Sequence, residues 1–106
     1  MTKIISIDTS DNKKINVELN VNGARKSLSS ESVILKSEAA LPLIDKLLKE
    51  NNLTIEEIDE IKVNEGPGSY TGVRVGAAIA NALGFVLKIP INGKRIGELA
   101  APVYNK

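Results

Sequence analysis

Residues 15–23 read INVELNVNG, and this stretch decides the fold. Apolar residues occupy every second position from Ile15 to Val21, a period of two that predicts a strand with one buried face. The Asn22-Gly23 pair that follows is a strong signal for a tight hairpin, because both central residues of that turn need a positive φ. The stretch therefore predicts an antiparallel sheet near the N-terminus.

Two further strands flank this hairpin. Lys3 to Asp8 contains a short apolar run ahead of the turn residues at 10–12, which predicts a first strand. Residues 24–34 are polar and rich in serine, which is typical of a strand at the edge of a sheet. Together the three strands predict an antiparallel meander.

Beyond residue 36 the apolar residues follow a helical spacing. Ser37 is a suitable N-cap for a helix that extends to about Asn51. Thr54 and Glu57 match a capping box, which predicts a short helical turn. A second long helix is predicted from about Val73 to Leu87.

Short apolar runs at 61–63 and 89–91 add two strands to the meander. We therefore expect one α/β domain over residues 1–106, with a mixed five-stranded sheet and crossover helices. This is the arrangement of a ribonuclease H-like or actin-like ATPase lobe, and the analogy concerns the fold alone.

Composition excludes several function classes. The chain has 106 residues, a net charge of +1, no cysteine and no histidine. It therefore has no disulfide, no thiolate metal site and no histidine base. A basic patch is limited to Lys13, Lys14, Arg25 and Lys26. With no signal-peptide pattern and no apolar run long enough to span a membrane, the cytoplasm is the expected location.

The segment Gly66-Pro67-Gly68-Ser69-Tyr70-Thr71-Gly72 joins a predicted strand to a predicted helix. Its glycines serve either a structural turn or a phosphate cradle at the helix N-terminus. It is not a Walker A loop, because the Gly-Lys-Ser/Thr ending is missing. A nucleophilic Ser69 or Thr71 would need a lysine as its base, so helix capping is the simpler role.

Small residues recur every four positions in the following helix, at Gly76, Ala80 and Gly84. Each glycine lowers helix propensity by about 1 kcal/mol relative to alanine, so such a row usually serves close packing. The row packs either on the sheet of the same chain or on another subunit. We predict a subunit interface, completed by an apolar face of the first helix at Leu41, Ile44 and Leu48.

Three motifs together resemble the N-terminal half of the TsaB family, also called YeaZ. The first is Ile7-Asp8-Thr9-Ser10 and the second is Leu41-Pro42-Leu43-Ile44-Asp45. The third extends from Gly66 to Gly76 and reads GPGSYTGVRVG. The resemblance implies an actin-like ATPase-type fold and a role in making threonylcarbamoyladenosine in transfer RNA. It also implies a non-catalytic subunit without metal or cofactor, which dimerises through its N-terminal helices with TsaD or with itself. TsaE completes the assembly, and contact with tRNA is indirect.

The same resemblance marks a ligand or structural loop, formed by Asp8, Thr9, Gly66, Gly68, Ser69, Thr71, Gly72 and Arg74. Two departures from the family pattern matter. We expect the second lobe to be absent, and with it a nucleotide site between lobes. Lys36 also stands where the family often has histidine.

An alternative function on the same superfold is a metal-dependent nuclease. Asp8 and Glu65 follow two predicted strands, and Glu38 or Asp45 would add a third carboxylate around divalent ions. The simpler interpretation is that Asp8 caps a turn and Glu65 pairs with Arg74.

Overall fold

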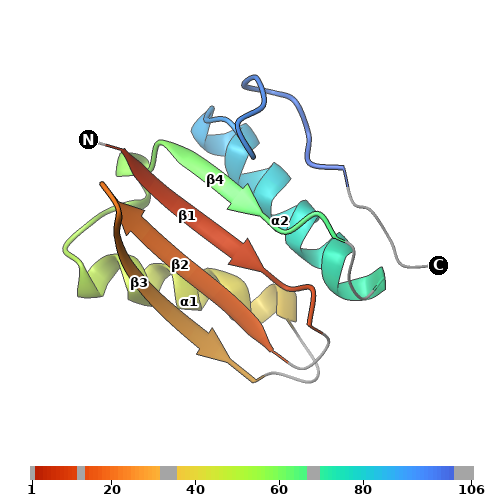
Figure 1. The fold of residues 1–106 in the computed structure, drawn as a ribbon, viewed down its shortest axis with the longest axis horizontal. Coiled ribbons are helices and arrows are strands. Elements are labelled where there is room, and N and C mark those ends of the chain that lie inside the picture. The colour runs from red at the N-terminus through yellow and green to blue at the C-terminus, as the bar shows by residue number, and fades with distance from the viewer. Residues whose placement is uncertain (1, 12–13, 32–35, 67–69, 102–106) are drawn as a thin grey trace.

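The computed structural model describes residues 2–11, 14–31, 36–66 and 70–101. Its strands form one sheet in the order β3-β2-β1-β4; one long helix lies between β3 and β4 in the chain, and a second follows β4 (Figure 1). The elements are β1 (Lys3–Asp8), β2 (Ile15–Val21), β3 (Ala24–Ser30), α1 (Lys36–Glu50), the 3-10 turn η1 (Ile55–Glu57), β4 (Glu60–Val63) and α2 (Tyr70–Leu87).

The predicted meander is confirmed. β2 pairs antiparallel with both β1 and β3, while β4 pairs parallel with β1. Asn22 and Gly23 form the β2–β3 turn with φ of 54° and 90°, the positive values that the sequence pattern requires. The side chain of Asn20 also accepts a hydrogen bond from the Gly23 N–H at 2.8 Å, which fixes the turn.

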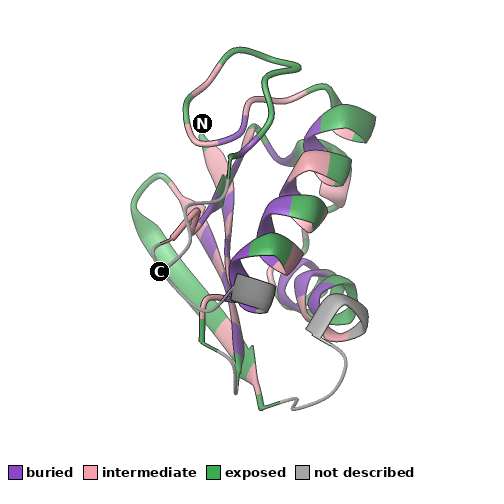
Figure 2. Cartoon of the chain, turned by 90° about the vertical axis from the view of Figure 1, so that its right-hand side faces the viewer, coloured by how far each residue is buried: buried purple, intermediate pink, exposed green. Residues whose placement is uncertain are grey.

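Both helices cover the same face of the sheet (Figures 1 and 2). Alternate residues of β1, β2 and β4 point into this layer and are buried with the inner residues of the helices. Each fully buried aliphatic side chain contributes about 1.5–3 kcal/mol to the stability of the fold. Because these side chains gather in one cluster, this single layer supplies most of the apolar burial. The opposite face of the sheet is polar and half-buried.

The predicted fifth strand is reduced to a single bridge. Among the described residues after α2, only Ile91 forms a bridge with β4, as a parallel partner of Ile61. Pro90 has no N–H to donate, and Asn92 and Gly93 then turn the chain with φ of 53° and 72°. The expectation of a five-stranded sheet is therefore corrected to four strands in the part of the chain that the structure describes.

The Asn92 side chain extends this short pairing. Its Oδ1 accepts from the Val63 N–H at 2.8 Å, and its Nδ2 donates to the Val63 carbonyl at 3.1 Å. One amide side chain thus occupies both backbone groups of the last β4 residue, as a neighbouring strand would.

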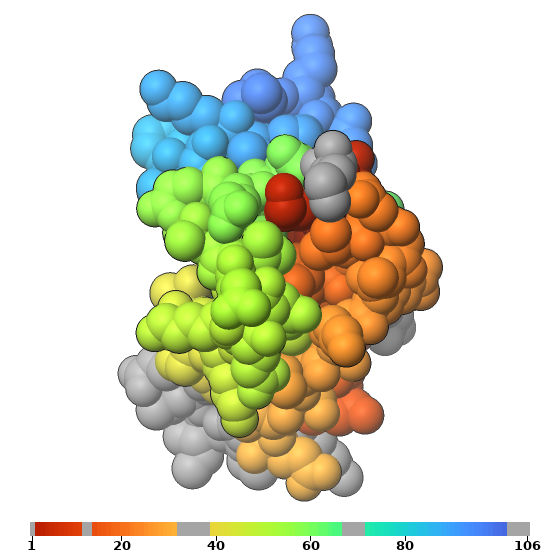
Figure 3. All heavy atoms as spheres, turned by 90° about the vertical axis from the view of Figure 1, so that its left-hand side faces the viewer, coloured from red at the N-terminus to blue at the C-terminus, as the bar shows by residue number. Residues whose placement is uncertain are grey.

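The segment after α1 closes one end of the molecule, where it lies beside the β2–β3 hairpin (Figure 3). The predicted capping box is present, with the Thr54 N–H donating to the Glu57 carboxylate at 2.8 Å. Asp59 then binds the start of β1 through its N–H and its carboxylate, both at 2.8 Å from Lys3 backbone atoms. Within the described residues, no helix has the length and apolar character needed to cross a membrane.

Candidate functional site

The first part of α2 lies directly against the end of β1. Thr9 is fully buried there, and its hydroxyl donates to the Gly72 carbonyl at 2.5 Å. A Cβ at Gly76 would overlap the Thr9 hydroxyl, so only glycine fits at this distance from β1. Thr9, Gly72 and Gly76 therefore hold α2 on the sheet.

The rest of the small-residue row faces the same way. Ala80 has no exposed surface, and a Cβ at Gly84 would come within 2.7 Å of the Ile91 side chain. Because Gly76, Ala80 and Gly84 are occupied by contacts within the chain, their assignment to a subunit interface is corrected. The row is the inner face of α2, as the sheet-packing alternative required.

The structure describes only part of the glycine-rich turn. Gly66 has a φ of 108°, and its N–H donates to the Asn64 side chain at 2.9 Å, which accounts for glycine at this position. The predicted loop residues Gly68 and Ser69, and the side chain of Thr71, lie outside what the structure describes. Arg74 is exposed on the first turns of α2.

Asp8 organises the turn after β1, as its simpler interpretation predicts. One carboxylate oxygen accepts from the N–H and the hydroxyl of Ser10, at 2.9 and 2.6 Å. The Asn64 amide donates to the same oxygen at 3.4 Å and to the Ser10 hydroxyl at 3.1 Å. These bonds join the carboxyl ends of two neighbouring parallel strands.

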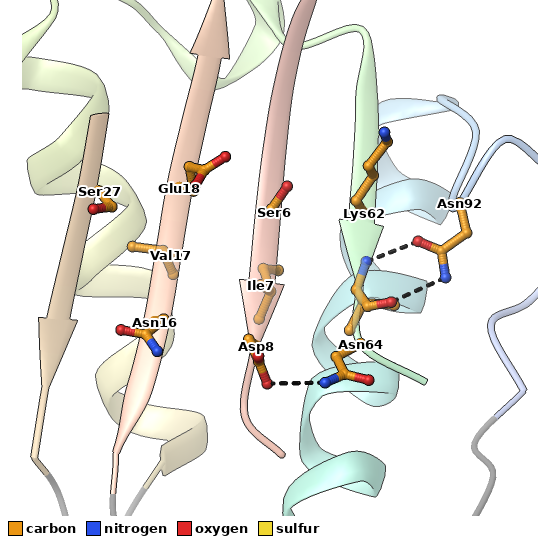
Figure 4. Close-up of a pocket in the computed structure, with 11 residues that line it drawn as sticks. Ser6, Ile7, Asp8, Asn16, Val17, Glu18, Ser27, Lys62, Asn64 and Asn92 are labelled. Carbon is orange, nitrogen blue, oxygen red and sulfur yellow. Dashed lines mark hydrogen bonds between the residues drawn. The ribbon is translucent and has the colours of Figure 1, made fainter. Parts of the chain in front are cut away.

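Asp8 also lines a polar hollow of about 540 Å³ on the open face of the sheet (Figure 4). Serine and asparagine side chains line it from β1, β2 and β3, joined by Asn64 just after β4 and by Asn92. The charged members are Asp8, Glu18 and Lys62.

Glu65 fastens a distant segment to the end of β4. It accepts from Asn92 Nδ2 at 2.9 Å, Lys94 Nζ at 3.1 Å and the Ala101 N–H at 2.6 Å. Partial burial acts to raise its pKa, but these hydrogen bonds and the charge of Lys94 outweigh burial and hold the pKa below its ordinary value of 4.5. Its ion pair in the described structure is therefore with Lys94, not with Arg74 as expected.

The carboxylates of the nuclease alternative do not gather. Asp8 and Glu65 are held by separate sets of hydrogen bonds, and Asp45 pairs with Lys49 on the exposed side of α1 at 2.9 Å. The side chain of Glu38 is outside the described set. No group of three or more acidic, cysteine or histidine residues suited to a metal occurs among the residues that the structure describes.

The sequence-predicted basic patch is only partly described. Arg25 and Lys26 are exposed on β3, and Arg25 lies 3.8 Å from Glu18. Lys13 lies outside the described ranges. A neighbouring carboxylate thus offsets part of this small positive surface.

An apolar hollow of about 500 Å³ is lined by α1, by one residue of α2 and by the segment that leads into η1. The predicted residues Leu41, Ile44 and Leu48 all line it, with Leu41 exposed and the other two forming its floor. Sequence reasoning missed three further apolar residues of the wall, which are Leu53, Ile55 and Leu83.

A second missed feature is the outer ridge of α2. Ala78, Ala82, Phe85 and Val86 are exposed there, and Phe85 retains 80% of its surface. The sequence did contain a signal for this ridge. Its residues Ala78, Ala82 and Val86 repeat every four positions, as Gly76, Ala80 and Gly84 do, but two residues later. The ridge was missed because the interface was assigned to the smallest residues of the helix, which lie on its inner face.

Comparisons with known proteins agree on one family. A family model described as TsaD, tRNA N6-adenosine threonylcarbamoyltransferase, matches residues 34–96. The tRNA threonylcarbamoyladenosine biosynthesis protein TsaB of Haemophilus influenzae is 33% identical over 88 residues, which are 83% of this chain and 37% of that protein. TsaB of Bacillus subtilis is 34% identical over 80 residues, covering 65% of this chain and 35% of its own length.

The fold is also similar to a solved structure. YeaZ from Pseudomonas aeruginosa matches 90% of this chain and 44% of its own chain, with a TM-score of 0.80 and 28% identity. This chain therefore spans less than half the length of each of these relatives.

Proposed function

Because this chain belongs to the TsaD-type family, with TsaB (YeaZ) proteins as its relatives, we propose that it is a TsaB-like, non-catalytic subunit in the biosynthesis of threonylcarbamoyladenosine in tRNA. In this proposal it acts by pairing with a TsaD-like transferase. Residues 1–106 would form one N-terminal lobe of the actin-like ATPase superfold.

The uses of the polar residues support a non-catalytic role. Thr9 fixes α2 against the end of β1, Asp8 organises the turn after β1, and Glu65 holds the segment around Ala101. Asp8, Thr9, Gly66 and Gly72, which belong to the predicted loop, thus each have a structural task. A cofactor is not needed for a subunit that works through its surface.

The helical face supports pairing with a transferase. The TsaD family model spans residues 34–96, which include all of α1 and α2. A transferase of this family would thus carry the corresponding helices. Two homologous faces can meet about an approximate two-fold axis, as the same patch does in a symmetric dimer.

The observation that carries the proposal is the apolar surface of these helices. Leu41, Phe85 and Val86 keep 53%, 80% and 72% of their surface in the isolated chain. Where exposed apolar side chains gather into a patch, they usually mark a protein interface, and the proposal takes these three residues as parts of one. Within the assembly, a TsaE-like protein and tRNA would be reached through the transferase.

Co-purification with a TsaD-like transferase tests the proposal, followed by reconstituted formation of threonylcarbamoyladenosine on tRNA. Ala82→Glu places a charge on the outer ridge of α2. It should abolish both binding to the transferase and stimulation of threonylcarbamoyladenosine formation. Ser29→Glu introduces the same charge on exposed β3 and should leave both unchanged. Equal binding by the two variants, or product formation by this chain without the transferase, would contradict the proposed role.

A further inference from the structure

The chain contains two Asn-Gly pairs, Asn22-Gly23 and Asn92-Gly93, and all four residues have a positive φ. Asparagine is thermally labile, because the next backbone nitrogen can attack its side-chain amide. Glycine in the next position leaves this approach open, since it has no side chain. The two pairs share this local chemistry, so a difference in their reactivity comes from their surroundings.

Asn22 lies in the β2–β3 turn, where both it and Gly23 are exposed. Its Oδ1 accepts from the Thr2 N–H at 3.0 Å, and the Gly23 N–H donates to the Asn20 side chain at 2.8 Å. Both bonds are at exposed positions, where water replaces a protein partner with little change in free energy. Motion of the turn alone therefore releases the amide carbon and the nitrogen that attacks it.

Asn92 is half-buried, and three partly buried hydrogen bonds hold its amide group (Figure 4). Its Oδ1 accepts from the Val63 N–H, while its Nδ2 donates to the Val63 carbonyl and to the Glu65 carboxylate. The nitrogen that would have to leave is thus held twice. Reaction at Asn92 requires this segment to separate from β4, which is a local unfolding step.

We propose that Asn22 is a site of spontaneous deamidation and that the fold protects Asn92. The Gly23 nitrogen loses its proton and bonds to the side-chain carbonyl carbon of Asn22, and the side-chain nitrogen leaves as ammonia. Water then opens the cyclic imide at either of its two carbonyl groups, which gives aspartate or isoaspartate. This reaction needs no enzyme, and it is independent of the proposed pairing with a transferase.

The two products differ in their effect on the hairpin. Aspartate keeps an acceptor for the Thr2 N–H, so the turn is retained. Isoaspartate adds one methylene group to the backbone of a two-residue turn that is closed by the pair Val21 and Ala24. Turn length fixes the register of a hairpin, so the longer backbone loosens the pairing of β3. Because β3 lies at the edge of the sheet and pairs with β2, the effect is confined to this edge.

Mass spectrometry of the folded chain tests the site of reaction. The protein is incubated in mildly alkaline water labelled with heavy oxygen and then digested with trypsin in ordinary water. Heavy oxygen thus marks only the deamidation that preceded digestion. Residues 15–25 form the peptide with Asn22, in which Asn16 and Asn20 precede valine and act as controls, and residues 89–94 form the peptide with Asn92.

In the folded chain, Asn22 should react roughly tenfold or more faster than Asn92, because the bonds at Asn92 must open first. In urea, where the chain is unfolded, the two rates should converge. Glu65→Ala removes one bond to the Asn92 amide and should raise the rate at Asn92 severalfold without changing the rate at Asn22. Asn52 is exposed with a φ of 57° but precedes Leu53, so it should stay unmodified.

Hydrogen exchange tests the consequence for β3. The isoaspartyl form, separated by chromatography, should exchange the β3 amides faster than the native chain, whereas Asn22→Asp should not. Equal rates at Asn22 and Asn92 in the folded chain, or a difference that persists in urea, would overturn the proposed protection by the fold. Unchanged exchange in the isoaspartyl form would overturn the effect on the hairpin. Binding to the transferase is measured separately, so none of these outcomes decides the proposed function.

Discussion

At Gly76, α2 approaches β1 so closely that a methyl group has no room beside the buried Thr9 hydroxyl. Gly76→Ala should raise helix propensity by about 1 kcal/mol, yet overpacking a fixed site usually destabilises by about 1–3 kcal/mol. We expect overpacking to dominate, because the Thr9 hydroxyl is held by the Gly72 carbonyl. Chemical denaturation of the variant should show a net loss of stability.

The matched control is Ala78→Gly, two residues further on the exposed side of the same helix. It should lower stability by about 1 kcal/mol through propensity alone. A Gly76→Ala variant more stable than the native chain would show that Thr9 moves aside, and the close contact would then have no role in fixing α2.

Glu65 provides a pH-dependent contribution to stability. Its pKa is lower in the folded chain than its ordinary value of 4.5, so the contribution is fully present above that value and is lost as the pH falls through the folded pKa. Glu65→Gln should therefore reduce the free energy of unfolding at pH 7 by about 1–3 kcal/mol, the usual range for a charged hydrogen-bonded group. The difference from the native chain should shrink in acid.

Glu98→Gln is the control for this measurement. Glu98 lies 4.0 Å from Arg95 in an exposed ion pair, for which an effect of about 0–1 kcal/mol is typical. Urea denaturation at pH values from 3 to 7 gives the free energy of unfolding of the native chain, Glu65→Gln and Glu98→Gln. A constant difference between Glu65→Gln and the native chain across this range would mean that the carboxylate charge is not what holds the segment at Ala101.

Among the elements, the truncated fifth strand depends on the Asn92 side chain. Asn92→Asp keeps an acceptor but loses the donor to the Val63 carbonyl, and it places a carboxylate beside Glu65. We expect a loss of about 1–3 kcal/mol at neutral pH. Thermal denaturation should show partial recovery at a pH where one of the two carboxyl groups is protonated.

Asn22→Asp is the matched substitution, since Asn22 is also followed by glycine and also has a positive φ. Its Oδ1 accepts from the Thr2 N–H at 3.0 Å in an exposed turn, and aspartate retains that bond. The change should stay within about 0.5 kcal/mol of the native chain. If both variants lost similar amounts of stability, the effect would come from the turn backbone and not from the pairing of the Asn92 side chain with β4.

The elements were predictable to the extent that local periodicity specified them. The alternation from Ile15 to Val21 and the Asn22-Gly23 turn gave the meander, because both depend on neighbouring residues. The prediction of a fifth strand was wrong at Pro90 and Asn92. Pro90 has no N–H to donate, and the Asn92 side-chain amide takes the place of backbone pairing. Such a replacement depends on β4 lying alongside, which local sequence does not encode.

The candidate site was less predictable for a related reason. Periodicity shows that Gly76, Ala80 and Gly84 share a face, but not whether that face meets the sheet or a partner. The choice is decided by Thr9 and Ile91, which come from distant parts of the chain. Leu41, Ile44 and Leu48 were correctly grouped because a single apolar face identifies them, although their use as an interface stays a proposal.

At the scale of the whole molecule, one sheet face is covered by helices and the helices are themselves uncovered on their outer side (Figure 2). The inner row of α2 then governs folding, whereas the outer ridge is free to govern association. Ala80 and Ala78 represent these two surfaces, since Ala80 is fully buried and Ala78 is exposed. The same substitution at the two positions therefore separates the two properties.

Ala80→Leu should destabilise the chain by about 1–3 kcal/mol, because the added volume must enter a packed layer between α2 and the sheet. Ala78→Leu should leave the melting transition nearly unchanged, because its side chain extends into solvent, but it should weaken binding to the TsaD-like transferase by keeping the partner away from the outer ridge of α2. Thermal melts measure the first property, and co-purification with the transferase measures the second. If Ala80→Leu disturbed association while leaving the melt intact, Ala80 would belong to an interface, and the inner and outer faces of α2 would have to be exchanged.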